Sequence, residues 1–202
     1  MLVESDVDEG TGRVDGRTAR SLRTRQAVID AMLGLIEDGD LRPTAPRIAE
    51  RAGVSLRTVF QHFCDLDTLF IEAAKHHFTA HFELHRTVPR DLPTAERIDA
   101  FAAQRCSLYE VVAPVRMAAE VNEAFSADGL AVLTLTRASY RSELEWLFEA
   151  EFDALGEHRL ASIDAADAAT CFAAWRHQNR LGHANEQVAA AMALTLRRLL
   201  LP

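Results

Sequence analysis

Residues 43–63 have the sequence PTAPRIAERAGVSLRTVFQHF, which predicts two short helices joined by a tight turn. Ile48 and Ala49 fall on one face of the first helix, where small Ala49 lets a second helix cross closely. Gly53 follows that helix at a position where a left-handed backbone is easiest to adopt without a Cβ. Ser55 is placed to cap the second helix, because its hydroxyl can accept a free amide N–H of the first turn.

The second of these helices is expected to show a polar face to solvent. Val59 and Phe63 are four residues apart, so both should point inward. The residues left facing outward are Arg57, Thr58, Gln61 and His62. A short rigid helix with such a donor-rich face suits the major groove of DNA.

This segment resembles the DNA-binding half of the tetracycline-repressor (TetR) family of transcriptional regulators. The residues that carry the resemblance are Thr44, Ile48-Ala49, Ala52-Gly53-Val54-Ser55, Thr58-Val59-Phe60, His62-Phe63 and Leu69. The match covers about the first third of the chain, and the remainder is similar only in length and helical character. The chain departs from the family at Phe60, where Tyr is usual, and at Leu66, where Lys is common. In the family both of those side chains contact phosphate.

The resemblance implies an all-α fold with an N-terminal three-helix head, which carries the helix-turn-helix, and a larger helical body. The expected divisions are a disordered arm over 1–17, a DNA-binding domain over 18–64, and a regulatory and dimerisation domain over 65–202. It also implies a homodimer formed through the last two helices, a double-stranded palindromic DNA operator and a small-molecule effector, with repression as the expected outcome.

The predicted DNA contacts lie on the second helix, on the start of the first helix of the pair, and on arginines nearby. They are Arg23, Thr44, Arg47, Ser55, Leu56, Arg57, Thr58, Phe60, Gln61 and His62. Thr44, Ser55 and the arginines are expected at phosphates, and Phe60 against a sugar or a thymine methyl group.

Charge is distributed unevenly along the chain. The net charge is -8, but residues 11–63 contain nine arginines against six acidic residues. Residues 64–202 contain 13 basic and 20 acidic residues. A basic head on an acidic body is typical of a regulator with a separate domain that does not touch DNA.

Apolar periodicity predicts helices throughout and no strand. The expected helices cover about 21–37, 43–52, 56–63, 65–86, 94–112, a helix beginning at Pro114, 130–155, 164–181 and 184–201. Pro89 and Pro93 should break the chain before the fifth helix, because proline does not fit a helix interior. Residues 126–129 are expected to form a turn.

The body is expected to enclose a ligand cavity. The candidate ligand-binding residues are Phe101, Arg105, Tyr109, Met117, Tyr140, Trp146 and Trp175, with Arg116 as a further guess. Arg105 lies on an apolar stripe, where an unpaired buried charge would be costly. It could bind an anionic ligand, or it could pair with an acidic residue on a neighbouring helix.

Histidines at four-residue spacing, His77, His81 and His85, could present imidazoles to a metal. Alternatively, together with His76, they form a wet polar stripe or pack among aromatic residues. Cys64, Cys106 and Cys171 have no close spacing, which argues against a disulfide framework or a CxxC metal site. No metal and no cofactor is therefore expected.

An enzyme is the competing class of function. The sequence lacks GxSxG, HExxH and a glycine-rich phosphate loop after a strand. Two further possibilities are a helix-turn-helix regulator of another type and a TetR-like protein whose body takes no inducer. No apolar run approaches the roughly 18 residues of a membrane span, and the acidic first ten residues do not form a signal peptide. A cytoplasmic protein with no membrane partner is expected.

Overall fold

Helices account for the regular structure of the described residues, 16–81, 88–123 and 126–201, in this computed structural model. In chain order they are α1 (Gly16–Glu37), α2 (Ala45–Ala52), α3 (Leu56–His62), α4 (Leu66–Ala80), α5 (Thr94–Asn122), α6 (Ala127–Leu147), α7 (Glu149–Ala154), the 3-10 turn η2 (Gly156–His158), α8 (Arg159–Thr170), α9 (Phe172–Arg180) and α10 (Asn185–Leu200). The all-α prediction is confirmed. None of the described helices combines the length and the apolar character that a bilayer span requires.

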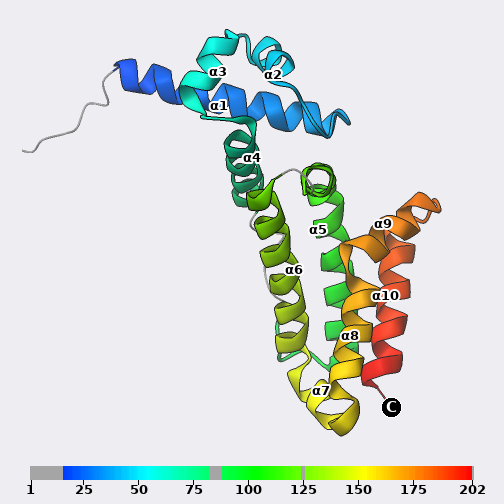
Figure 1. Cartoon of the computed structure of the whole chain (residues 1–202). Helices are drawn as coiled ribbons and strands as arrows, with labels where there is room; N and C mark the ends of the chain where they lie inside the picture. The colour runs from blue at the N-terminus through cyan, green and yellow to red at the C-terminus, as the bar shows by residue number, and fades with distance from the viewer. Residues whose placement is uncertain (1–15, 82–87, 124–125, 202) are drawn as a thin grey trace, which may run out of the picture.

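The first three helices form a head at one end of the molecule, and α4 leads from the head to the body (Figure 1). The apolar stripe of α1, which includes Val28, Met32 and Ile36, packs against Ile48 of α2 and Val59 of α3. All five side chains are buried. The head therefore has a core of its own, built around one face of α1.

This core continues into the body. Leu69 and Ala73 of α4, Val115 and Ala118 of α5, and Leu133 of α6 belong to the same apolar cluster. The head consequently rests on the ends of α5 and α6 as well as on α4. A change in how these three helices pack would therefore reach α1 directly.

The body has a second apolar core around α5, which runs beside α10 (Figure 1). Tyr109 of α5 sits at its centre, with the ring of Phe172 edge-on at 5.4 Å and the ring of Trp175 at 5.9 Å. The Tyr109 hydroxyl donates a hydrogen bond to the Thr170 carbonyl at 3.0 Å. This bond satisfies the one polar group that Tyr109 brings into the core.

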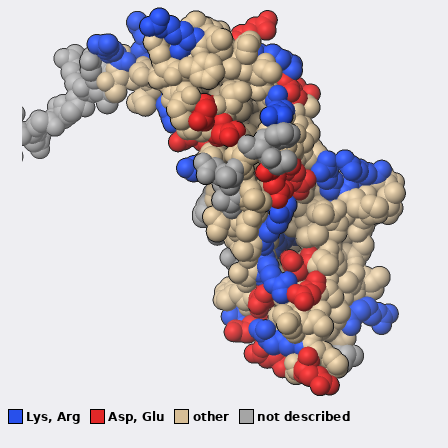
Figure 2. All heavy atoms as spheres, in the orientation of Figure 1, with Lys and Arg blue, Asp and Glu red and all other residues tan. Residues whose placement is uncertain are grey.

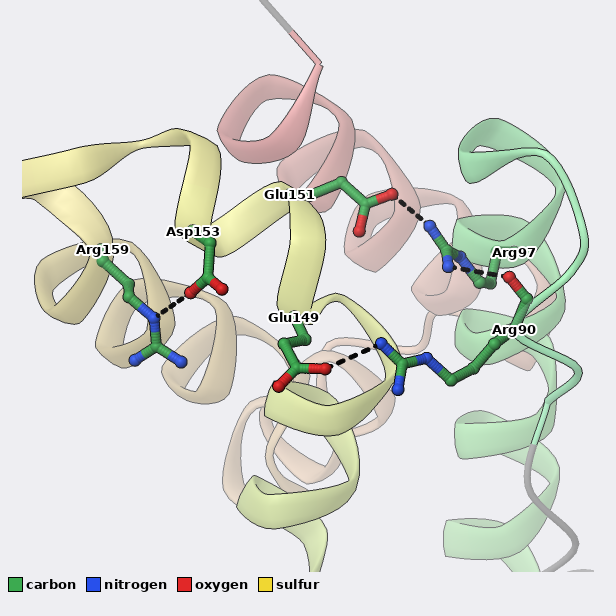
Figure 3. Close-up of polar contacts among 6 residues, drawn as sticks. All are labelled: Arg90, Arg97, Glu149, Glu151, Asp153 and Arg159. Atoms are coloured by element: carbon green, nitrogen blue, oxygen red, sulfur yellow. Dashed lines mark hydrogen bonds and ion pairs between the residues drawn. The ribbon is translucent and has the colours of Figure 1, made fainter.

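Ion pairs fasten the end of the body that lies farthest from the head (Figure 3). Arg97 at the start of α5 pairs with Glu151 of α7, and both side chains are largely buried. Arg90 reaches Glu149 at 3.0 Å, and Arg159 reaches Asp153 at 2.7 Å. These contacts hold α7 against the first turn of α5 and against the start of α8.

Several helix boundaries differ from the prediction because packing overrides local signals. α1 begins at Gly16, five residues before the expected start. Pro114 does not start a new helix, and α5 runs through it as one helix of 29 residues. Ala113 and Val115 on either side are buried, and their packing offsets the roughly 3 kcal/mol that a mid-helix proline costs.

The second half of the chain is divided differently from the prediction. The expected helix over 130–155 begins already at Ala127, so 126–129 is not a turn, and it is interrupted at Phe148, the N-cap of α7. The expected helix over 164–181 is two helices separated by Cys171, whose backbone is extended. Gly182, with φ of 86°, forms the expected turn before α10.

Candidate nucleic-acid interface and binding cavity

The turn between α2 and α3 fixes the orientation of α3. Gly53 adopts a left-handed backbone with φ of 66°, and its N–H bonds to the carbonyls that end α2. The Ser55 hydroxyl accepts a hydrogen bond from the Thr58 N–H at 3.1 Å, as predicted for the cap. Val59 and Phe63 are buried against α1. Because these two anchors lie on one face, the opposite face of α3 is turned toward solvent.

The outward face of α3 carries most of the residues predicted to contact DNA. Arg57 and Gln61 are exposed, and His62 is half-buried. Leu56 and Phe60 are 43% and 47% exposed, although both are large and apolar. Such exposure at the ends of a polar face suits contact with a sugar or a thymine methyl group.

Two of the predicted contacts also hold the turn together. The Thr58 hydroxyl lies 2.8 Å from the Ser55 hydroxyl, so both side chains are already engaged within the turn. Thr44 precedes α2 and is exposed. Its position would allow its hydroxyl to cap the helix, but the side chain makes no capping hydrogen bond. Pro46 near the start of α2 lacks one of the amide hydrogens that a cap would otherwise satisfy.

Arginines of the head fall into two groups. Arg23 on α1 and Arg57 on α3 are exposed, as is Arg20, and no carboxylate among the described residues pairs with them. By contrast, Arg47 pairs with Asp40. Unpaired guanidinium groups are available to interact with a polyanion, whereas the ion pair between Arg47 and Asp40 must break before Arg47 can do so.

Other head arginines have structural partners. Arg51 pairs with Asp38, which ties α2 to the end of α1. Arg25 lies over the Phe63 ring at 4.8 Å and pairs with Glu72 of α4 at 3.2 Å. Figure 2 shows several groups of Lys and Arg atoms along the outer edge of the head, with fewer acidic groups among them, and basic and acidic atoms interleaved along the body. Basic groups therefore outnumber acidic ones on this face of the head.

The two positions that differ from the TetR-family pattern, Phe60 and Leu66, differ in exposure. Phe60 projects into solvent, where a phenyl ring can pack but cannot donate a hydrogen bond. Leu66 at the start of α4 is half-buried against the head core. Neither side chain has a charge or a hydroxyl with which to contact a phosphate.

A cavity of about 280 Å³ lies where α4, α5 and α6 meet. Its lining is mainly apolar: Phe70, Ile71, Ala74, Lys75, His77, Phe78 and Thr79 from α4, Val112, Val115, Arg116 and Ala119 from α5, and Leu133, Thr136 and Tyr140 from α6. The volume approaches the lower end of the range typical of small-molecule sites, about 300 Å³. The cavity adjoins the helices on which the head rests.

The predicted ligand residues are scattered in relation to this cavity. Tyr140 lines it, and so does Arg116. Phe101 and Tyr109 are fully buried in the body core, and Met117 packs against that core. These three side chains are not part of the cavity lining.

The two tryptophans also lie elsewhere. Trp146 is exposed on α6, with the Arg90 guanidinium 4.8 Å above its ring. Trp175 is buried in α9, and its Nε1 donates to Asn185 Oδ1 at 2.9 Å. The residues of α4 that form one wall of the cavity were missed, because apolar periodicity alone does not separate a cavity wall from a packed face.

Arg105 is 1% exposed and pairs with Glu143 of α6 at 2.8 Å. Its guanidinium also lies over the rings of Phe101 at 4.6 Å and Tyr140 at 4.7 Å. The second of the two expectations, an acidic partner on a neighbouring helix, describes what is seen. Arg105 is thus supplied with a counter-charge by the protein itself, as buried charges require.

The histidines of α4 have unequal environments. His77 is buried, and its ring lies 4.4 Å from that of His81. Burial lowers the pKa of His77, and the charges of His81 and His76 act in the same direction. Within the described residues no three potential ligands lie close enough to hold a metal ion. His85 lies outside the described residues.

Exposed apolar side chains lie on the two helices predicted to form the dimer, 164–181 and 184–201, and on the turn of helix just before them. Leu160 of α8, Leu181 after α9 and Leu194 of α10 are each more than half exposed. The same helices also face inward, because Val188, Met192 and Leu196 of α10 are buried against the body core. α10 therefore has apolar residues on its outer side as well as on its core side.

Comparisons with known proteins identify a solved structure that has a similar fold. No model of a protein family matches this sequence, and no curated protein matches it. A transcriptional regulator from Rhodococcus sp. Rha1 has a similar structure, with a TM-score of 0.66, 20% identity, and coverage of 89% of this chain and 95% of that chain. At this identity the similarity shows a common fold.

A second solved structure, of a proposed TetR-family transcriptional regulator from Mesorhizobium loti MAFF303099, is 16% identical over 90% of this chain and 96% of that chain. Its TM-score of 0.45 is too low to support an argument.

Proposed function

We propose that this protein is a DNA-binding transcriptional regulator that reads a palindromic operator as a homodimer. The observation that carries the proposal is the outward polar face of α3, with exposed Arg57 and Gln61 fixed by buried Val59 and Phe63. A helix so mounted can enter the major groove and present side chains to base edges. The shared fold with a transcriptional regulator supports the same interpretation.

Arg57 and Gln61 are assigned to base edges, and His62 to a base or the backbone beside them. Phe60 and Leu56 are assigned to sugars and thymine methyl groups. Thr44, Ser55, Arg23 and Arg47 are assigned to phosphates, with Thr58 supporting the turn and reaching the backbone. Because the contacts to phosphate release counterions, binding should weaken steeply as salt increases.

The dimer is assigned to α8, α9 and α10, where Leu160 and Leu194 are exposed. A two-fold pairing would present two copies of α3 to successive major grooves, about 34 Å apart. The interface would be isologous, with each patch contacting its own copy. Since DNA is the partner, the cytoplasm is the proposed site of action.

The cavity between α4, α5 and α6 is assigned to a small-molecule effector. Leu133 and Val115 contribute both to the cavity lining and to the cluster on which the head rests. A ligand that binds one arrangement of these helices more tightly shifts the population toward it, and so changes the separation of the two α3 helices. We assign repression to the ligand-free dimer and release to the ligand-bound one.

The test is selection of bound sequences from a random DNA pool by the full-length protein, followed by anisotropy titration of the recovered site. A palindrome is expected, and the Arg57→Ala/Gln61→Ala double variant should lose about a thousandfold or more in affinity, since each of the four base contacts that a dimer loses is worth about 1–3 kcal/mol. Arg137→Ala on α6 is the matched surface control and should bind normally. Full specific binding by the double variant would disprove the assignment of α3.

An enzyme remains the competing class. Incubating the protein with any small molecule that binds the cavity, and finding product, would favour that class over an effector site. We expect the ligand to be recovered unchanged.

A further inference from the structure

The charged and hydrogen-bonding groups of the cavity are mostly donors. Lys75 and Arg116 line it, and no Asp or Glu belongs to its lining. Tyr140 adds a phenol whose pKa is raised by burial, so that it remains a neutral O–H donor at neutral pH. Every other lining residue is apolar except His77, Thr79 and Thr136.

Arg116 is not fully satisfied within the protein. Its side chain is 9% exposed, and its Nε is buried without a hydrogen-bond partner. The nearest carboxylate oxygen, on Glu120, lies 3.7 Å from that Nε, beyond hydrogen-bond distance. Glu120 also pairs with Arg176 at 2.8 Å, so one carboxylate serves two guanidinium groups. This part of the cavity wall therefore carries excess positive charge.

Lys75 adds a second positive charge at the exposed side of the cavity. It is the single lysine of the chain. Its side chain is exposed and has no acidic partner within the described part of the structure. Two cations beside a mainly apolar lining are suited to a molecule with an apolar body and one anionic end.

We propose that the cavity binds a small monocarboxylate, with its hydrocarbon part against Phe70, Val112 and Leu133 and its carboxylate between Lys75 and Arg116. The inference rests on the proposed function, in which this cavity holds the effector, and specifies the chemical class of that effector. The Tyr140 hydroxyl donates to the same carboxylate. A neutral amide of the same shape offers these donors a weaker, uncharged acceptor, and a cationic molecule leaves them unpaired.

The experiment compares three probes with one hydrocarbon chain and different ends: octanoate, octanamide and octylamine. Each is titrated calorimetrically into the full-length protein without DNA. Octanoate should bind roughly tenfold more tightly than octanamide, since charge-assisted bonds to a carboxylate are replaced by neutral ones. Octylamine should bind most weakly. Equal affinity for the acid and the amide, or no binding of any probe, overturns the proposal.

Lys75→Met separates the charge from the packing. The substitution should lower the affinity for octanoate about threefold, in keeping with an exposed ion pair, and leave the affinity for octanamide unchanged. Arg137→Met removes an exposed cation outside the cavity and should change neither the affinity for octanoate nor that for octanamide. Because Lys75 is the single lysine, reductive methylation with labelled formaldehyde gives one dimethyl-lysine NMR signal, which should shift with octanoate and not with octanamide. A signal that shifts equally with both overturns the role of Lys75.

These measurements separate the two proposals. Octanoate preference without any effect of octanoate on operator binding would count against effector control of DNA binding and leave the carboxylate site standing. Normal operator binding by a protein that does not prefer octanoate would overturn the carboxylate site alone.

Discussion

Three exposed arginines of the head and three arginines of the body have the same side chain in opposite surroundings. In the body Arg97, Arg105 and Arg141 each pair with carboxylates of other helices, and Arg141 reaches Glu145 and Asp164 at once. In the head Arg20, Arg23 and Arg57 face solvent without a carboxylate among the described residues. Pairing within the body stabilises its fold, whereas lack of pairing in the head leaves charge for a partner.

The comparison explains how an acidic protein can present a basic surface. Net charge sums over the whole chain, but a polyanion responds to the charge within about a Debye length, roughly 8 Å in physiological salt. Many carboxylates of the body pair with arginines of the body, as Glu143, Glu149 and Glu151 do, and acidic and basic atoms alternate on its surface (Figure 2). The outer edge of the head is thus shielded from them by distance and by salt.

The largest expected effect on stability comes from removing the carboxylate partner of a buried arginine. Glu143→Gln keeps the shape of the side chain but removes the counter-charge of Arg105, whose side chain is 2% exposed. The free energy of unfolding should fall by about 3 kcal/mol. Glu149→Gln, the partner of more exposed Arg90, should lower it by less than about 1 kcal/mol. Urea denaturation of both variants measures the difference, and equal losses would contradict the distinction between buried and exposed pairs.

A second prediction compares paired and unpaired arginines within the head. Arg23→Gln should reduce the slope of log affinity against log salt by about 1.8 for a dimer, because each lost phosphate contact contributes about 0.9. Arg47→Gln should reduce it less, since Asp40 already neutralises that side chain. Titrations of operator DNA between low and moderate salt give both slopes. Identical slopes for the two variants would mean that the pair with Asp40 opens on DNA.

The third prediction concerns the turn that carries α3. Ser55→Ala removes the bond to the Thr58 N–H and should cost about 1 kcal/mol of stability. Thr44→Ala is the matched control, since the Thr44 side chain makes no capping bond, and should cost a few tenths of a kcal/mol at most. Thermal unfolding of the two variants under the same conditions tests this. A Thr44 variant as unstable as the Ser55 variant would show that Thr44 caps α2.

The smallest effect is a pH dependence that arises from His77. Burial first, then the charges of His81 and His76, lower its pKa below the usual 6.5, while the Val111 backbone and Glu37 act in the opposite direction. Lys75 and Arg116 are the other charged residues that line the same cavity. As the pH falls through 6.5 the unfolded chain binds the proton before the folded one, so stability decreases.

Urea midpoints measured between pH 7.5 and pH 5.5 should therefore fall for the native protein and fall less for His77→Gln. His158→Gln, at an exposed histidine, is the control and should follow the native profile. The same pH profile for the native protein and for His77→Gln would contradict the assignment to His77.

The head could be predicted from the sequence because its structure depends on local chemistry. Gly53 and Ser55 determine a turn within a few residues, and Val59 and Phe63 determine the buried face of α3. The body was predicted only as a set of helices. The break at Cys171 has no glycine or proline to mark it, and it follows from how Phe172 and Trp175 pack around Tyr109.

The cavity was missed for a related reason. Its walls come from three different helices, so which residues line the cavity depends on tertiary packing rather than on apolar periodicity. Tyr140 was expected to bind ligand and does line the cavity, but nothing in the sequence distinguishes Phe70 and Leu133, which also line it, from ordinary helix-face residues. Likewise, the sequence suggested that an acidic residue on a neighbouring helix could pair with Arg105, but it could not identify that residue as Glu143.

Pro114 gives α5 a property that no other long helix described in the body has. Proline carries no amide hydrogen, so the carbonyl of Glu110 one turn earlier receives no helical bond from it, and the helix is more easily bent there. Val112, Val115 and Arg116 beside this position belong to the cavity wall. The cavity wall can thus widen through a bend of α5 at Pro114, without repacking of the body core. Carboxylates of increasing chain length should therefore lose affinity gradually rather than at a sharp size limit.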